Sequence, residues 1–120
     1  MPENYRKFQA GPDPFGRVWD VEFRWLQTGI SIRHADTVDV KFAAGIAEEP
    51  KHEKVIALRH PDLLQLASAT GHPLTDGWCI KLAALHLIHM IDTADDMEKI
   101  LVTVEYPDLA QYASALKKAA

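Results

Sequence analysis

Histidine and aspartate recur at helical spacing in one stretch of the chain, residues 76–92. His86 and His89 are three positions apart, and Asp92 follows three positions later. Residues three apart are neighbours on a helix, and imidazole and carboxylate groups bind zinc and other divalent ions. Because each residue turns a helix by about 100°, His86 and Asp92 lie about 120° apart, too far round a straight helix for one ion to bind all three. His86 and His89 are therefore the candidate metal ligands. The candidates for a distant third ligand are His34, His60 and His72.

The same two histidines have a structural explanation, which we favour. Between its terminal aspartates the stretch carries a single charge, Lys81, and this is typical of a buried helix whose histidines are hydrogen-bonded at its edge. A histidine there could also act as a general acid or base, because it titrates near neutral pH. No nucleophile motif of the GxSxG type accompanies it, and Cys79 lies inside the apolar helix, where we expect a buried, inert thiol.

Length and composition indicate one ordinary globular domain over residues 1–120, with residues 1–16 as an irregular leader rich in glycine and proline. The chain is 48% apolar and 25% charged, and its net charge of −4 disfavours nucleic acid as a partner. A single cysteine excludes an intrachain disulfide and fits a reducing compartment, so we predict a cytoplasmic protein.

Motifs for membranes and cofactors are missing from the sequence. The first nine residues are polar, and the longest apolar run, 78–91, is too short and too polar for a membrane span, which needs about 20 residues. There is no P-loop or Rossmann glycine pattern, and the acidic stretches lack the spacing of an EF-hand. We therefore predict no cofactor and no membrane association.

Alternation of apolar and charged residues predicts a strand over residues 17–26. One face would carry Trp19, Val21, Phe23 and Trp25, and the other Asp20, Glu22 and Arg24. The aromatic face could stack on a base or a sugar ring, but we favour packing against the helices. A turn at 27–29, a strand at 30–34, a turn at 35–36 and a strand at 37–43 would complete a three-stranded antiparallel meander.

Two segments of the chain echo each other. Residues 60–69 read HPDLLQLASA and residues 106–115 read YPDLAQYASA, and each follows a short apolar strand, at 54–59 and 98–105. Proline suits the first helical turn and Gly71 suits the end of the first helix. The echo could build two halves of a symmetric site, although a twice-used helix start explains it more simply. The long connection between the two strands allows them to lie parallel, joined by a right-handed crossover.

These features predict an α+β fold: a mainly antiparallel sheet of about five strands, beginning with a β-meander, with three helices packed mostly on one face. For function we favour a non-enzymatic binding or self-association module. A homodimer would form through a sheet edge or face, and another protein is the alternative partner. The alternative function is a small metal- or histidine-dependent enzyme centred on His86 and His89.

Overall fold

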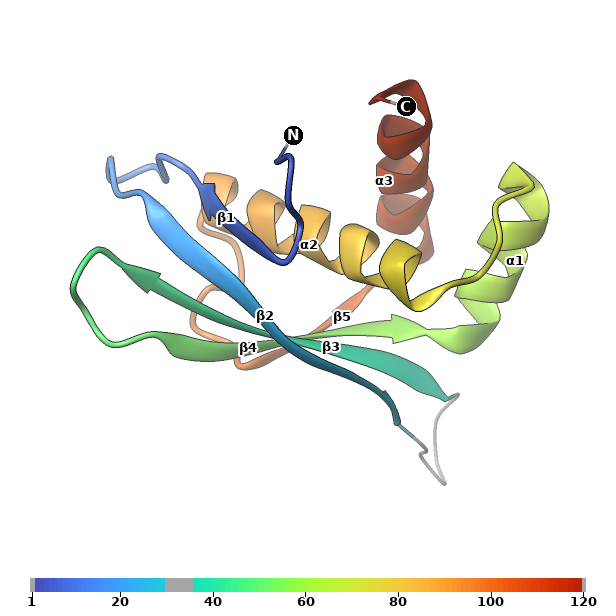
Figure 1. Cartoon of the computed structure of the whole chain (residues 1–120), viewed down its shortest axis with the longest axis horizontal. Coiled ribbons are helices and arrows are strands. Elements are labelled where there is room, and N and C mark those ends of the chain that lie inside the picture. Colours follow the sequence, from blue (N-terminus) through green and yellow to red (C-terminus); the bar gives the residue numbers. More distant parts are fainter. Residues whose placement is uncertain (1, 30–35, 120) are drawn as a thin grey trace.

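A five-stranded sheet with strand order β1-β2-β3-β4-β5 forms one layer of the structure, and the helices cover one of its faces (Figure 1). The computed structural model describes residues 2–29 and 36–119. The strands are β1 Lys7–Ala10, β2 Trp19–Gly29, β3 Thr37–Ile46, β4 His52–Arg59 and β5 Leu101–Val104, and the helices are α1 His60–Thr70, α2 Asp76–Thr93 and α3 Tyr106–Ala119. Strands β1 to β4 pair antiparallel and β5 pairs parallel with β4. The predicted α+β class, strand number and N-terminal meander are confirmed.

Two of the three predicted strands of the meander, at 17–26 and 37–43, correspond to β2 and β3, and the third differs from the prediction. β2 runs through Gly29 and pairs directly with β3, so the predicted turn at 27–29 is wrong. The predicted strand at 30–34 lies outside the described residues. The missing third strand is β1, which lies within the stretch 1–16 that we predicted to be irregular. Four residues are too few to show an alternating pattern in the sequence, although Phe8 and Ala10 are buried as a strand requires.

A β-bulge divides β2 into two parts with opposite side-chain alternation. Phe23 pairs with Phe42 and Trp25 pairs with Lys41, so Arg24 is an extra residue in β2. One added residue moves every later side chain to the other face. Leu26 consequently packs against the core, and Trp25 lies on the open face beside Lys41, whose Nζ is 5.2 Å from the centroid of a Trp25 ring. The predicted shared face of Trp19, Phe23 and Trp25 is therefore wrong at Trp25.

The core lies between the sheet and α2, as the apolar stretch at 76–92 indicates. Thr75 caps the helix, because the Trp78 N–H donates to its hydroxyl (3.2 Å). At the centre of the sheet Phe42 makes edge-to-face contacts with Phe8 and Phe23. Eleven residues of α2 are buried: Trp78, Cys79, Ile80, Leu82, Ala83, Ala84, Leu85, His86, Leu87, Met90 and Ile91. No helix in the described part of the chain is long and apolar enough to cross a membrane.

The two echoed segments form neighbouring strand-helix units. β4 leads into α1 and β5 leads into α3, and the two strands pair in parallel, an arrangement that the long connection between them allows. Pro61 lies in the first turn of α1, and Gly71 ends that helix with a φ of 70°. The guanidinium of Arg59, at the end of β4, donates to both carboxylate oxygens of Glu105, which follows β5 (3.1 and 3.2 Å). The repeated sequence thus encodes a repeated structural unit.

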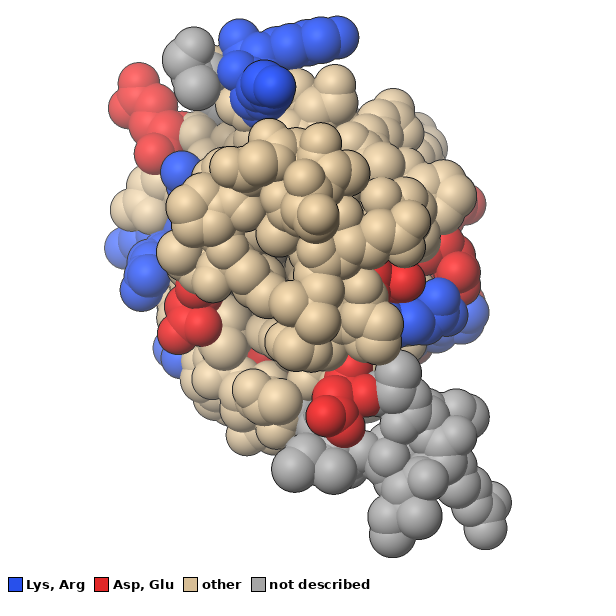
Figure 2. Space-filling model, turned by 90° about the vertical axis from the view of Figure 1, so that its right-hand side faces the viewer, with Lys and Arg blue, Asp and Glu red and all other residues tan. Residues whose placement is uncertain are grey.

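The helices of these two units carry few charges on their outer surfaces. Figure 2, which views the molecule from the side of α1 and α3, shows a broad area without Lys, Arg, Asp or Glu, with charged side chains around its rim. The exposed residues of α1 include Leu64, Gln65 and Ser68, and those of α3 include Gln111 and Ser114. The echoed sequence therefore produces a largely uncharged surface over α1 and α3.

Two buried charged side chains hold loops in place. The Asp13 carboxylate accepts hydrogen bonds from the N–H groups of Phe15 and Arg17, the Arg17 guanidinium and the Trp19 indole, which fixes the β1–β2 loop. Lys54 is 5% exposed and lies on the helix-facing side of β4. Its ammonium group donates to the carbonyl oxygens of Met97 and, at 2.8 Å, Lys99. It thereby ties the loop between α2 and β5 to the sheet.

Candidate functional site

His86 is a buried histidine with a side-chain partner on another helix. Its Nδ1 shares a hydrogen bond of 2.7 Å with the hydroxyl of Tyr112 on α3. Burial lowers the pKa of His86, and the neighbouring His89 lowers it further, against a raising effect of Asp108. Burial also raises the pKa of Tyr112. Neutral imidazole and neutral phenol therefore face each other across the α2–α3 contact, and this matches the hydrogen-bonded core histidine that we favoured.

His89 lies on the exposed side of the same helix edge. The ring centroids of His86 and His89 are 6.2 Å apart and the rings are tilted by 35°. Across residues 2–29 and 36–119, no group of three or more His, Cys, Asp or Glu side chains is placed to hold a metal ion. The histidine pair could therefore supply at most two ligands from the described residues.

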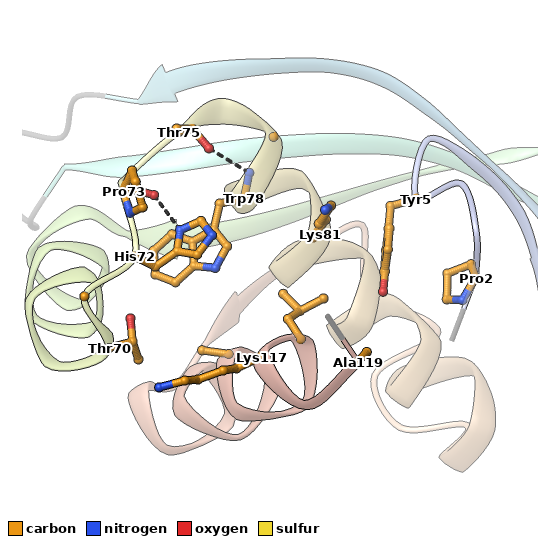
Figure 3. A pocket seen from close by; sticks show the side chains of 14 residues that line it. Pro2, Tyr5, Thr70, His72, Pro73, Thr75, Trp78, Lys81, Lys117 and Ala119 are labelled. Atoms are coloured by element: carbon orange, nitrogen blue, oxygen red, sulfur yellow. Dashed lines mark hydrogen bonds between the residues drawn. The ribbon is translucent and has the colours of Figure 1, made fainter.

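A large pocket lies elsewhere, at the opposite end of α2. It has a volume of about 720 Å³ and is bounded by the N-terminal segment, the α1–α2 loop, the first turns of α2 and the second half of α3. Ligand pockets in proteins have volumes of about 300–1,000 Å³. Its size and its position between four separate segments make it the best candidate site in the molecule (Figure 3).

One wall of the pocket is a pair of stacked rings. His72, in the loop between α1 and α2, lies against Trp78 with ring centroids 4.6 Å apart and planes 15° apart. The Nδ1–H of His72 donates to the carbonyl of Pro73 (2.7 Å), because a carbonyl oxygen can only accept. In the neutral ring the other nitrogen, Nε2, is then the acceptor. Tyr5 faces this pair from the other side of the cavity, as Figure 3 shows.

Two lysines, Lys81 and Lys117, are among the residues that line the pocket. Lys81 projects from α2, with its Nζ 5.7 Å from the centroid of the Tyr5 ring, and Lys117 lies along α3 below the His72–Trp78 stack (Figure 3). Both lysines are exposed. None of the described residues that line the pocket is Asp or Glu. Much of the remaining lining is apolar or small, including Leu116, Ala113 and Gly77.

Cys79 and the aromatic residues Trp19 and Phe23 of β2 pack in or against the core. Cys79 is buried, and burial, with a smaller effect of Asp76, raises the pKa of its thiol to about 11. A protonated thiol is a poor nucleophile, as we expected for this residue. Trp19 and Phe23 pack against the core, so the aromatic residues of β2 do not form an open stacking surface.

Sequence reasoning did not find this pocket. His72 was considered only as a distant metal ligand, and Lys81 only as the single charge of a buried helix. The lining residues come from sequence positions between 2 and 119, so no local motif joins them. The one local signal was Lys81, a charge on an otherwise apolar helix. Searches against family models, curated proteins and solved structures found no match to this chain.

Proposed function

We propose that this chain is a non-enzymatic binding module whose ligand is a small molecule with an apolar body, held in the pocket between α2 and α3. The observation that carries the proposal is the cavity of about 720 Å³ between aromatic and aliphatic side chains. Such concave sites, with a few polar groups around an apolar lining, are the usual form of small-molecule sites. Trp78 and Tyr5 supply flat apolar walls, and Leu116 supplies an aliphatic one.

Gly77 provides a way to block the pocket without damaging the fold. A Cβ built at Gly77 meets no atom within 4 Å, so a side chain there extends into open space at the pocket wall. Glycine is also a poor helix former, by about 1 kcal/mol relative to alanine. We therefore expect Gly77→Ala to stabilise α2 and leave the pocket open, and Gly77→Leu to stabilise α2 and place a bulky side chain at the pocket wall, where it obstructs a bound ring.

Isothermal titration calorimetry with a neutral aromatic probe, 2-naphthamide, tests the proposal. Wild type and Gly77→Ala should bind the probe, and Gly77→Leu should not. Circular dichroism should show all three proteins folded. Absence of binding to wild type, or equal binding by Gly77→Leu, would refute a ligand site at this position.

The free edge of β5 supports a second candidate function, self-association. Ile100 and Leu101 are 66% and 57% exposed at this edge, and β4 is the only strand that pairs with β5 in the described part of the chain. The Val55 N–H donates to the Ile100 carbonyl (2.7 Å), so by the alternation of a ladder the backbone groups of Leu101 and Thr103 point away from β4. Exposed apolar edges of this kind pair readily with another strand.

A twofold, antiparallel pairing of β5 with β5 of a second copy suits these groups. Centred on Val102, it places Leu101 of one copy opposite Thr103 of the other, so that the outward backbone groups meet. It also places Lys99 of one copy opposite Glu105 of the other, and opposite charges favour such a pair.

Sedimentation velocity over a range of micromolar concentrations tests self-association. Wild type should form a dimer, and Leu101→Lys should weaken it because a charged edge residue opposes strand pairing. Leu64→Lys is the matched control, since Leu64 is a similarly exposed leucine (51%) on α1. A purely monomeric wild type, or an equal effect of the two substitutions, would exclude this edge.

A further inference from the structure

We infer that the ligand of the pocket between α2 and α3 carries a carboxylate, which Lys81 and Lys117 bind at the pocket rim while the apolar body of the ligand lies between Tyr5 and Trp78. This inference rests on the proposed function and adds the chemical class of the ligand. It depends on the charges around the cavity, whereas the proposed function depends on the cavity's apolar volume.

The charges at the rim are unbalanced. Lys81 and Lys117 both line the pocket, and none of the described lining residues is an acid. Neither lysine takes part in an ion pair with another described residue, whereas Lys41, Lys51 and Lys99 each do. In a chain with a net charge of −4, this is a local excess of positive charge beside an apolar surface. A ligand with an anionic head and an apolar body complements both parts of the site.

The neighbouring groups limit the charge of that head. His72 uses its Nδ1–H for the Pro73 carbonyl, so that nitrogen is not available to bind a ligand. Asp76 is exposed in the first turn of α2, next to Gly77 of the pocket wall, and its carboxylate opposes the approach of a doubly charged anion. Two ammonium groups with one nearby acid suit a singly charged carboxylate better than a phosphate dianion.

The two lysines come from different helices on either side of the cavity. A carboxylate that contacts both of them would therefore lie at the rim of the pocket. Lys81 is on α2 and Lys117 is on α3, with the cavity between them (Figure 3). Figure 3 shows Lys117 directed toward the Thr70 side of the pocket and Lys81 nearer to Tyr5, so the two side chains must turn toward each other to bind one carboxylate. Lysine side chains are long and flexible and present compact point charges, which allows this without the fixed geometry of a guanidinium group. The apolar body then enters the cavity below the head.

Calorimetric titration with a matched pair of probes, 2-naphthoate and 2-naphthamide, tests the inference. The two share one ring system and differ in the charge of the head. Wild type should bind 2-naphthoate about tenfold more tightly than 2-naphthamide, as expected for hydrogen bonds to a charged group. Lys81→Met and Lys117→Met should each weaken 2-naphthoate about three- to tenfold and leave 2-naphthamide within about twofold.

Lys118→Met is the control, because Lys118 is an exposed lysine on the same helical turn as Lys117 but does not line the pocket. It should leave both probes unaffected, and Gly77→Leu should abolish the binding of both. Equal binding of the two probes by wild type, or an equal effect of Lys117→Met and Lys118→Met, would overturn the carboxylate and leave the proposed function standing. Failure of both probes to bind would overturn the proposed function and the carboxylate together.

Discussion

Replacing Lys54 by methionine tests the role of the buried ammonium group that holds the loop between α2 and β5. Methionine has a similar length and shape, so the change removes the charge and its hydrogen bonds and keeps most of the packing. Two carbonyl oxygens, those of Met97 and Lys99, lose their donor. Hydrogen bonds to charged groups contribute about 1.5–3 kcal/mol each, and relief of burying the ammonium offsets part of that sum. We expect Lys54→Met to lower the free energy of unfolding by about 2–4 kcal/mol.

The thermal equivalent follows from the size of the chain. An unfolding entropy of about 2.1 cal/mol/K per residue gives about 0.25 kcal/mol/K for this chain, so the melting temperature should fall by about 8–16 °C. Urea unfolding and thermal melting, both followed by circular dichroism, measure the two quantities. Lys51→Met is the matched control, because Lys51 makes one partly exposed ion pair with Glu22 (3.3 Å), and such pairs near the surface are worth about 0–1 kcal/mol. A loss in Lys54→Met no larger than in this control would refute the assigned role.

Four further substitutions probe the repeated unit and the buried titratable groups. Leu63 and Leu109 occupy matching positions in α1 and α3 and are fully buried, so Leu63→Ala and Leu109→Ala should each cost about 2.5–5 kcal/mol in urea titrations. Burial lowers the pKa of His86, so the unfolded chain binds this proton at a higher pH than the folded one. Stability should therefore fall as the pH drops below about 6.5, and His86→Gln should flatten that slope. Burial alone would raise the pKa of Asp13, but hydrogen bonds from its loop lower it to about 2. Its contribution is present above about pH 4 and is lost as the pH falls towards 2, so Asp13→Asn should lower the melting temperature at pH 7 and weaken this acid dependence.

Each of these predictions would be contradicted by a specific result. A loss below about 1 kcal/mol for either alanine substitution would show that the two units are not packed alike. An unchanged pH slope in His86→Gln would place the titration on another group. An Asp13→Asn protein as stable as wild type at pH 7 would mean that the β1–β2 loop does not depend on the carboxylate.

The sequence predicted best those elements whose signal is local. Pro61 and Gly71 marked the ends of α1, and the apolar run after Asp76 marked α2. The long connection between the two strands that precede HPDLLQLASA and YPDLAQYASA allowed them to lie parallel, and β4 and β5 do pair in parallel.

The errors came from features that leave little trace in the residue pattern. The bulge at Arg24 reverses the alternation of β2, yet residues 19–25 still alternate in sequence, so Trp25 was assigned to the wrong face. β1 is a strand because β2 offers it an edge and a buried place for Phe8, which is a tertiary cause. Alternation shows which face a side chain takes only while the register is unbroken.

The candidate site depended on tertiary structure even more strongly. His86 was found because histidine spacing on a helix is visible, but its partner Tyr112 lies on another helix and turns it into a core residue. The stacking of His72 on Trp78 and the position of Lys117 beneath them depend on how α1, α2 and α3 pack. Periodicity in the sequence does not show which residues of separate helices and loops come into contact.

The strand order of the sheet also has a consequence for the route by which the chain folds. β1 to β4 are neighbours in the sheet in the same order as in the sequence, so their pairing needs only short loops to close. The pairing of Val55 with Leu101 instead closes a loop that contains α1 and α2. Closing a long loop costs more conformational entropy than closing a short one, and contacts between distant residues therefore form more slowly. We expect the meander to form early and β5 and α3 to pack against it late. Lys54, which reaches the loop before β5 from a strand of the meander, would then make its contacts only in the last stage of folding.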